Sequence, residues 1–578
     1  MNGKDSKRAK ILLPLFGLFS LIWFLLRVIP KPSRATYPCM RVAFPMASAF
    51  VVWLAGIGAS VLLVRKARTS LRESRFILAG MCGIVAAAAA WASFSGTIVP
   101  TVDIVPSLHA DTPDTPNAPI GVPKGLNPGR VVWVHDATAT DWTQGSGYSW
   151  QPAHTNQAVV DTMMSRAVRW LAGKSTEAEA WDALFHYTNL QKGTGDRGYQ
   201  AGEKIVIKIN LTMCYVASGS NPSSRSIVSL YRSPQNPSMT NPQMVLALLR
   251  QLVNVVGVSQ ANISVGDPLN FFPQEWYDYL HAEFPNVIYL DHYPFTGRTQ
   301  VNFSSTPFYW STANANGKLQ DYLPQPYEEA AYLINFATLK SHERAGITLS
   351  FKNNYGSLVR SPVGEYRGQT YSNYYNLHTN LEGNLPGRGH YRNLVDLMGH
   401  AHIGGKTLLF LIDALYGGKG AGGTPYKWNM APFNGDWPSS LFASQDPVAI
   451  DSVGFDFLLA EWPTEVSVWS GIAQDDLHEA ALANSPPSGT FYDPEGDGTA
   501  MASLGVHEHW NNATSKQYTR NLGTGTGIEL VSSDPLACSG NFDADGDVDG
   551  KDLAALIANS SLLDIANFSK NFGRNACP

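Results

Sequence analysis

Titratable side chains gather between two short apolar runs in residues 333–356, LINFATLKSHERAGITLSFKNNYG. The runs LINFA and GITLSF have the length and the apolar character of β-strands. Lys340 and His342 follow the first run, and Lys352 and Asn353 follow the second. Amines, an imidazole and an amide near strand ends have the chemistry to bind an anion and to transfer protons. A solvated loop is the alternative interpretation of this stretch.

Other apolar runs in residues 130–531 also end in polar residues. The runs are RVVWVHD, KIVIKIN, NISVGD, NVIYLD and TLLFLID. Their continuous apolar character is typical of strands that are buried on both faces of a parallel sheet. Helical patterns lie between them, at residues 156–171 and after the cap Thr240-Asn241-Pro242. This alternation predicts an α/β domain with a mainly parallel sheet. The polar residues at the strand ends are Asp136, Asn210, Asp267, Asp291 and Asp413.

Ligands of open parallel sheets collect beyond the carboxyl ends of the strands. Lys208 and Asn210 are two residues apart and would share one face of the sheet, as would Lys340 and His342. Two lysines that point into one crevice are costly unless an anion lies between them. We therefore predict that a small anion, a carboxylate or a phosphate, binds near Lys208, Lys340 and Lys352.

Several acidic residues also have structural interpretations. Asp446 precedes Pro447 and a helical pattern, so its role as an N-cap requires no chemistry. Asp267 precedes Pro268 and could shape a turn. Asp451, one turn into the predicted helix, would lie among apolar neighbours and would need a partner such as a cation or a metal ion.

Two His-x-His motifs are candidates for a second metal site, of unknown metal, in the α/β domain. They are His400/His402 and His507/His509. On a strand, such spacing places both imidazoles on one side, as many metal sites require. Glycines around the first pair favour a loop, where solvated or packed histidines are more common.

The C-terminal residues 532–578 contain an acidic loop with the spacing of a calcium site. The predicted ligands are Asn541, Asp543, Asp545, Asp547 (through its carbonyl), Asp549 and Asp552. Calcium binds such an array of oxygen atoms around a tight turn, here at Gly546. Since the helical pattern DLAALIAN follows at once, the module resembles a dockerin-type calcium module, for which a protein partner is implied. Only one acidic loop is present, so the pattern of that family is incomplete. Cys538 and Cys577 flank this module, and we expect them to pair outside the cytoplasm.

Residues 1–99 hold three long apolar stretches. The stretches are residues 11–29, 42–64 and 76–99. Each is near the roughly 20 residues that a helix needs to cross a bilayer, so the pattern predicts a membrane anchor of two or three transmembrane helices. The first stretch is alternatively a signal sequence or an interfacial segment. The second and third contain no ionisable residue, which favours anchoring over transport.

Basic residues set the expected orientation of this anchor. Lys and Arg cluster in residues 65–75, and the next basic residue is Lys124. By the positive-inside rule, the cluster lies in the cytoplasm, and the chain after residue 99 lies outside it. We therefore expect a protein of the cytoplasmic membrane whose globular part is periplasmic or at the cell surface. Residues 100–129, rich in Pro, Asp and Thr, indicate an extended spacer.

Composition excludes several classes of function. The 578 residues carry a net charge of -5, and no basic stripe or tail lies outside the first 75 residues, which excludes nucleic acid as a partner. The cysteines form no CxxC pair, so iron–sulfur and zinc-ribbon sites are excluded. The sequence also lacks a nucleophile elbow and a Walker loop.

Five segments together carry a resemblance over about residues 130–531. KIVIKINLT, NISVGD, LKSHERAGITLSFKNNYG, LLFLIDALYG and SSLFASQDPVAIDSVGFDFL resemble the domain-of-unknown-function 362 family. The residues at its characteristic positions are Lys208, Asn210, Asp267, Lys340, His342, Lys352, Asn353, Asp413, Asp446 and Asp451. The family has no established activity. Some relatives add ferredoxin-type cysteine motifs, and their absence here means that a redox role does not transfer.

Two classes of function follow. The first is an exported enzyme that acts on a small anionic substrate, with His342 as general acid or base and the lysines stabilising negative charge. The second is a cell-envelope binding or assembly protein whose calcium module docks a partner. Exposed aromatic side chains in the loops would favour the second class. The candidates are Trp142, Tyr148, Trp150, Tyr374, Tyr375 and Trp428.

Overall fold

The computed structural model describes most of the chain from Asp114 onward and a few residues before it. The described residues are 19, 21–23, 26, 64–69, 72, 114–214, 221–230, 238–313, 320–359, 365–366, 369–370, 380–381, 385, 387–420, 422, 425–463, 474–533, 548–558, 568–569 and 572–573. The chain divides into two units, Met1–Leu108 and His109–Pro578. The sheet and its covering helices belong to the second unit.

The predicted fold class began with transmembrane helices, and this part of the prediction is wrong for the residues that the structure describes. Within them, no helix combines the length and the apolar character that a membrane crossing requires. Most of the three apolar stretches of the first unit lie outside the described residues. The fold class is therefore corrected to a mixed α/β domain.

Among the described residues, ten strands form one sheet, in the order β16-β2-β14-β13-β9-β3-β4-β5-β6, with β10 paired to β9. Their bounds are β16 Glu529–Val531, β2 Arg130–His135, β14 Ser440–Ser444, β13 Thr407–Gly418, β9 Tyr332–His342, β3 Ile205–Ile209, β4 Ile263–Gly266, β5 Ile288–Asp291, β6 Thr299–Gln300 and β10 Gly346–Thr348. The strands from β13 to β6 run parallel, as do β2 and β16. Strand β14 is antiparallel to both neighbours, and β10 is antiparallel to β9. The sheet is therefore mixed, although most of its described strand pairs are parallel.

Two apolar clusters cover the two faces of this sheet. Alternate residues of a strand contribute to different clusters: Val206 and Leu333 to one, Ile207 and Ile334 to the other. Strand side chains alternate between faces, so strands with helices on both sides must be apolar at every position. The continuous apolar runs of the sequence have this cause.

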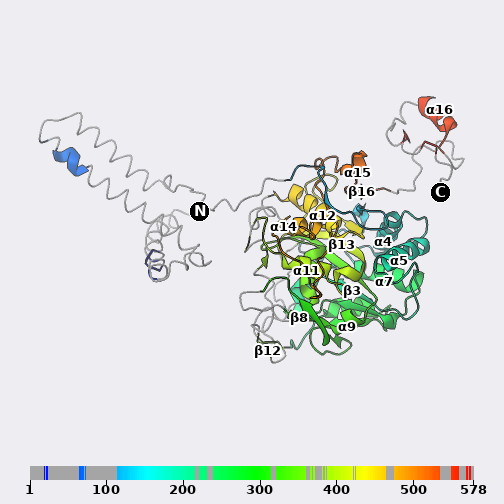
Figure 1. The fold of residues 1–578 in the computed structure, drawn as a ribbon, viewed down its shortest axis with the longest axis horizontal. Helices are drawn as coiled ribbons and strands as arrows, with labels where there is room; N and C mark the ends of the chain where they lie inside the picture. The colour runs from blue at the N-terminus through cyan, green and yellow to red at the C-terminus, as the bar shows by residue number, and fades with distance from the viewer. Residues whose placement is uncertain are drawn as a thin grey trace. The chain divides into compact units, whose positions relative to one another are not determined.

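Helices α4, α5 and α7 lie on one side of the central strands and α11, α12 and α14 on the other (Figure 1). The helices of the first face are α4 Gln157–Ala172, α5 Glu177–Gln191, α7 Pro242–Arg250 and α8 Gln274–His281, and those of the second are α10 Ser350–Asn353, α11 Asn393–Gly399, α12 Pro447–Glu461 and α14 Asp475–Ala481. Side-chain caps begin several of them. The Asn241 side chain accepts the Gln243 N–H, in the cap that the sequence predicted, and the Asn156 side chain accepts the Val159 N–H.

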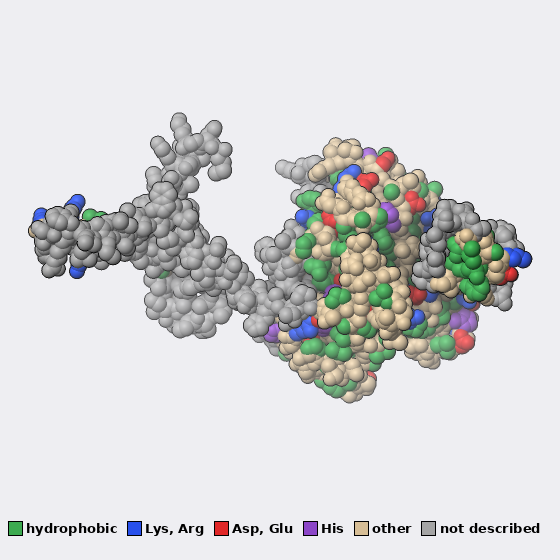
Figure 2. Space-filling model, turned by 90° about the horizontal axis from the view of Figure 1, so that it is seen from above, with side chains coloured by type: hydrophobic (Ala, Val, Ile, Leu, Met, Phe, Trp, Pro, Cys, Tyr) green, Lys and Arg blue, Asp and Glu red, His purple; other side chains and the backbone are tan. Residues whose placement is uncertain are grey.

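Shorter elements complete the second unit. Three strand pairs are β1 Ile120–Gly121 with β15 Val506–His507, β7 Phe303–Tyr309 with β8 Gln320–Pro324, and β11 Glu365–Tyr366 with β12 Gln369–Thr370. The short α-helices are α6 Ile227–Leu230, α9 Gln325–Glu329, α15 Thr519–Leu522 and α16 Gly550–Ala558. The 3-10 helices are Ala137–Ala139, Thr212–Cys214, Gln260–Asn262, Asn354–Ser357 and Gly404–Lys406, and the π-helix is Gln251–Val255. On the face that Figure 2 shows, acidic and basic side chains are scattered rather than gathered into one stripe.

Three local expectations can be compared with the structure. Asp446 is the N-cap of α12, as predicted, and its side chain accepts the N–H groups of Val448 and Ala449. The run GITLSF is only half a strand, because β10 ends at Thr348 and α10 begins at Ser350. Part of the predicted spacer, from Asp114 to Gly129, is packed against the α/β domain, since β1 pairs with β15.

Candidate functional site

The predicted residues lie around the carboxyl ends of β3, β4 and β9. Strand β3 is parallel to β4 on one side and to β9 on the other. After β3 the chain continues into α7 on one face, whereas after β9 it continues into α10 on the opposite face. Neighbouring strands whose connections leave in opposite directions form the crevice in which open α/β sheets bind ligands.

Lys208 and Asp267 form a buried ion pair at this edge. Lys208 Nζ lies 3.2 Å from Asp267 Oδ1, and both side chains are almost completely buried. Asp267 Oδ2 also accepts the Leu211 N–H at 3.1 Å and the Asn270 side-chain amide at 2.8 Å. Burial lowers the pKa of Lys208, while the charge of Asp267 raises it. A Cβ at Gly356 would lie 2.2 Å from Asp267 Oδ1, so this position must remain glycine.

Asn353 connects this ion pair to α10. Its Oδ1 accepts a hydrogen bond from Lys208 Nζ at 3.0 Å. Its amide group donates to the Lys208 carbonyl at 3.2 Å and to Asn335 Oδ1 at 2.8 Å. Asn335 was not among the predicted residues, although it lies beside Lys208 in the register of β3 and β9. Lys208, Asp267 and Asn353 thus satisfy one another, which indicates that they hold the strand ends in place.

Lys340 leaves the sheet on the opposite face from Lys208. Lys208 is paired with Asn335, whose side chain lies on the same face of the sheet as those of Leu333 and Ala337. Lys340 is an even number of residues from Ile334, so its side chain lies on the other face. The prediction placed both amines in one crevice. The alternation of side chains along paired strands sends them apart, because their register positions have opposite parity.

Lys340 is completely buried at the end of β9. Its Nζ donates to the Ser238 carbonyl at 2.8 Å and lies 3.3 Å from Thr212 Oγ1 and 3.4 Å from Asn210 Oδ1. Burial and the positive charge of Lys352 lower the pKa of Lys340 to about 7, against the influence of Glu343 and Asp267. Lys340 therefore changes its charge near neutral pH.

His342 and Lys352 lie near the surface of the same edge. His342 Nδ1 accepts the N–H groups of Arg344 at 3.0 Å and Ala345 at 3.1 Å. This assigns Nδ1 as an acceptor, so the neutral ring carries its proton on Nε2. Lys352 Nζ lies 3.7 Å from the centre of the Tyr355 ring. Both side chains are half-buried, in contrast to Lys340.

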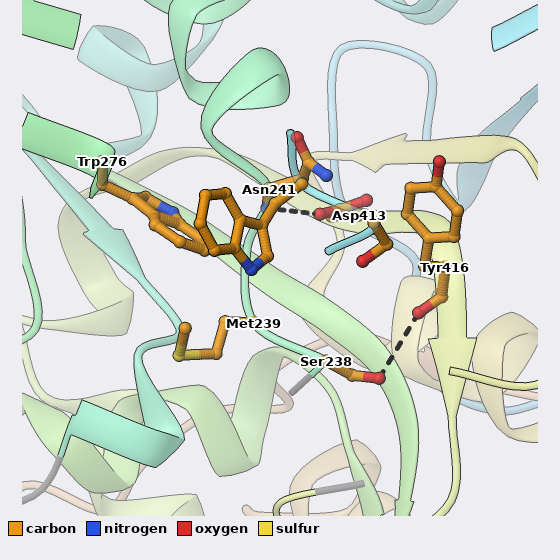
Figure 3. A pocket seen from close by; sticks show the side chains of 8 residues that line it. Ser238, Met239, Asn241, Trp276, Asp413 and Tyr416 are labelled. Atoms are coloured by element: carbon orange, nitrogen blue, oxygen red, sulfur yellow. Dashed lines mark hydrogen bonds between the residues drawn. The ribbon is translucent and has the colours of Figure 1, made fainter. Parts of the chain in front are cut away.

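Asp413 lies on the face of Lys340 and lines a small cavity. The cavity is about 10 Å³, which is room for about one water molecule. Asp413 Oδ2 accepts the Asn241 N–H at 2.6 Å, and Oδ1 accepts the Leu415 N–H at 2.9 Å. Burial raises the pKa of Asp413 to about 6. Ser238, whose carbonyl binds Lys340, also lines this cavity (Figure 3).

A larger cavity of about 380 Å³ shares a wall with the first. Thr155 of the larger cavity donates a hydrogen bond to the hydroxyl of Tyr416, which lines the smaller one, at 3.3 Å. Asp141 and His154 are among its lining residues. Its volume is within the range of small-molecule sites, and one side follows the carboxyl end of β2.

Asp446 and Asp451 have structural roles, and Asp451 also lines a cavity of about 10 Å³ together with Lys352. The carboxylate of Asp451 accepts the N–H groups of Ser350 at 2.8 Å and Phe351 at 3.0 Å. The sequence predicted a cation or a metal ion as the partner of Asp451. The N–H groups in the first turn of α10 take this role instead. Burial raises the pKa of Asp451 to about 7.

The aromatic residues that could have formed an open groove are largely core residues. Trp142, Trp150 and Trp428 are buried, Tyr148 is half-buried, and Tyr374 and Tyr375 lie outside the described residues. Cys214 is also completely buried, and burial raises the pKa of its thiol well above the ordinary value, so it is an inert thiol.

The two His-x-His motifs have different surroundings. His400 packs against Phe308, and its Nε2 lies 3.4 Å from Glu495 Oε2. His507 and His509 instead lie beside His478 and Asp114, and Asp114 precedes His478 by 364 positions in the sequence. Neither His478 nor Asp114 was a predicted site residue, because no spacing in the sequence links them to the motif.

Most of the predicted calcium loop lies outside the described residues, as do Cys538 and Cys577. The described ligands are Asp549 and Asp552. The Asp552 carboxylate is buried and accepts the Asp549 N–H at 2.9 Å. The helix predicted after the loop is present as α16.

The comparisons with known proteins concern the central part of the α/β domain. Residues 228–456 match the family model described as Domain of unknown function (DUF362). No curated protein and no solved structure matches the chain. Lys208 and Asn210 precede the matched segment, and residues 532–578 follow it. The ends of β4, β9 and β13, with Asp267, Lys340 and Asp413, thus lie in a segment that is similar to the DUF362 family.

Proposed function

We propose that the α/β domain is an enzyme that acts on a small anionic substrate, a carboxylate or a phosphate, at the carboxyl end of β9. The observation that carries this proposal is Lys340, a completely buried amine whose charge is opposed by burial and by nearby Lys352. A bound anion would offset both effects, because it attracts the two ammonium groups at once.

The side chains around Lys340 suit proton transfer to such a substrate. His342 holds its proton on Nε2 and could donate a hydrogen bond from this N–H group to a substrate oxygen. Lys340, with a pKa of about 7, could supply positive charge or accept a proton at neutral pH. The Lys208–Asp267 pair has a different role, since its charges already neutralise each other and Asn353 fixes their positions.

Anion binding by purified full-length protein tests this proposal. We expect calorimetry with inorganic phosphate and with malonate to show binding that weakens at least about tenfold in Lys340→Met and in Lys352→Ala, because each removes a positive charge from the site. Lys340→Met keeps most of the side-chain volume, and circular dichroism establishes that it folds.

A matched control is Lys427→Ala. Lys427 is an exposed lysine that pairs with Asp436, so its removal should leave the affinity unchanged. Affinities that are equal in the wild-type protein, Lys340→Met and Lys352→Ala would contradict the proposal.

We also propose that residues 541–552 bind one structural calcium ion, on the support of the spacing of their oxygen ligands. Calcium titration of the full-length protein should show binding that Asp543→Asn and Asp545→Asn weaken at least about tenfold, whereas Asp497→Asn, in another acidic loop, should leave it unchanged. Equal calcium binding in all variants would contradict this assignment. A protein partner for the module and a location outside the cytoplasm stay predictions.

A further inference from the structure

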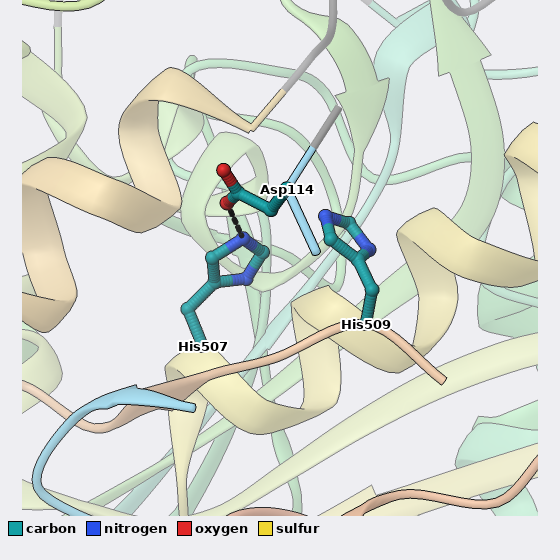
Figure 4. Close-up of side chains that lie close together, drawn as sticks. All are labelled: Asp114, His507 and His509. Carbon is teal, nitrogen blue, oxygen red and sulfur yellow. Dashed lines mark ion pairs between the residues drawn. The ribbon is translucent and has the colours of Figure 1, made fainter. Parts of the chain in front are cut away.

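Two histidines and one aspartate from distant segments lie close enough to share one ion beside α12, and a third histidine contacts the aspartate. His478 belongs to α14, His507 to β15 and His509 follows two residues later, while Asp114 precedes β1. Figure 4 shows Asp114, His507 and His509 with their polar atoms turned toward one another. Ligand atoms of these three residues all lie within 4.8 Å of one another.

The point of convergence is Asp114 Oδ2. His478 Nε2 contacts this oxygen directly, and His507 Nε2 lies 3.5 Å from it. His507 and His478 are 1% and 2% exposed, respectively. Among the described residues, His507 Nε2 has no hydrogen-bond partner. A buried imidazole nitrogen that faces a carboxylate without a hydrogen bond is costly, and a cation between the two groups would remove that cost.

The outward nitrogens of two of these histidines are held by other side chains. His507 Nδ1 lies 2.8 Å from Ser452 Oγ, and His509 Nδ1 lies 2.5 Å from Asp456 Oδ1. Asp456 is itself fixed, since its other oxygen accepts the hydroxyl of Tyr518 at 2.8 Å. Histidines that bind metals usually donate their second N–H group to such a partner, which orients the ring and fixes the tautomer.

We propose that Asp114, His507 and His509 bind one divalent transition-metal ion, for which zinc is the best match, while His478 contacts the carboxylate of Asp114 beside it. Two imidazoles and one carboxylate are unlike the all-oxygen sites of calcium and magnesium. Zinc–nitrogen bonds of about 2.0–2.1 Å place two tetrahedral ligands about 3.3–3.5 Å apart, which agrees with the 3.5 Å between His507 Nε2 and Asp114 Oδ2.

Two neighbours of the cluster limit the geometry of this site. Gln474 Oε1 lies 2.6 Å from His509 Nε2, so the ion must take the place of this hydrogen bond. Arg388 pairs with the other oxygen of Asp114, which leaves Oδ2 for the metal and orients the carboxylate. Without an ion, His509 would be an imidazolium held between Asp456 and Gln474, and this hydrogen-bonded network is the competing outcome of the test.

Three protein ligands leave the fourth position of a tetrahedral shell for a water molecule or, after a small shift of its ring, for His478. The ion would fasten the segment at Asp114 to β15. Strand β1 already pairs with β15 a few residues later. The metal would therefore stabilise the part of the domain in which the chain enters the fold, and this role is independent of anion binding at Lys340.

Metal analysis of the full-length protein tests the site. After chelation and reloading with zinc, we expect about one zinc ion per chain in the wild-type protein and a higher thermal unfolding temperature with zinc than without it. His507→Gln and Asp114→Asn should lose most of this zinc and the increase in unfolding temperature. His402→Gln, in the other His-x-His motif, should retain the zinc and the increase in unfolding temperature.

A second measurement does not depend on whether the variants fold. Wild-type protein reloaded with cobalt should show the intense visible absorption of tetrahedral Co²⁺, and X-ray absorption should show a first shell of nitrogen and oxygen with imidazole scattering. Wild-type protein that takes up no zinc or cobalt, or a folded His507→Gln variant that keeps its zinc, would overturn the proposal and leave the hydrogen-bonded network as the explanation of the cluster.

Discussion

Asp267→Asn is expected to lower the free energy of unfolding by about 3–5 kcal/mol, the usual cost of removing one partner of a buried ion pair. The Lys208 ammonium lies 3.2 Å from the lost charge and is almost completely buried, so solvent cannot take over the role of the carboxylate. The substituted amide also places its NH2 group either against the Lys208 ammonium or where Oδ2 now accepts both the Leu211 N–H and the Asn270 amide. Urea unfolding of the wild type and the variant measures the difference.

A salt bridge at the other end of β3 supplies the control. Lys204 Nζ lies 2.7 Å from Glu329 Oε2, and both side chains are well exposed, so Glu329→Gln should cost no more than about 1 kcal/mol. The double variant Lys208→Met with Asp267→Leu should recover part of the loss, because an apolar pair of similar volume needs no counter-charge. Equal costs for Asp267→Asn and Glu329→Gln would show that the buried pair does not hold the strand ends.

Features with a local cause could be predicted from the sequence. Strands β2, β3, β4, β5 and β13 coincide with the five apolar runs because both faces of the sheet are covered. The caps Asn241 and Asp446 were predictable because a cap depends on a few consecutive residues. The sequence also indicated that Lys340 and Asp267 would lie near the ends of strands, because each of them follows an apolar run.

Features that depend on distant segments could not be predicted in this way. The strand pattern of GITLSF was interrupted by Asp451, a residue a hundred positions later whose carboxylate binds the first N–H groups of α10. The register between β3 and β9 decides on which face of the sheet the side chains of Lys208 and Lys340 lie. Asp114 joins His507 only because β1 pairs with β15. In each case the sequence pattern describes a few neighbouring residues correctly, but a contact with a distant segment decides the local structure or the position of the side chain.

The affinity for a non-titrating anion is expected to fall as the pH rises above 7. A bound anion favours the charged form of Lys340, whose pKa is about 7, so at higher pH binding must also return a proton to the amine. The affinity should therefore be roughly 50-fold weaker at about pH 9 than at pH 7, and its decrease should approach about tenfold per pH unit well above the pKa. Calorimetry with malonate, whose carboxylates stay ionised over this range, measures the change.

The stability of the unliganded protein should show the opposite trend, and Lys340→Met provides the control. Lys340 binds its proton with a pKa of about 7 when folded, against 10.5 for an ordinary lysine. Between these values the unfolded chain holds more protons, so the contribution of Lys340 to stability rises with pH by up to about 1.4 kcal/mol per unit. The difference between wild type and Lys340→Met isolates this contribution from that of Lys406, whose pKa burial also lowers to about 7. An affinity for malonate that is constant from pH 7 to about pH 9 would mean that the anion does not bind at Lys340, whereas a pH-dependent affinity that Lys340→Met abolishes would establish this amine as the anion-binding group.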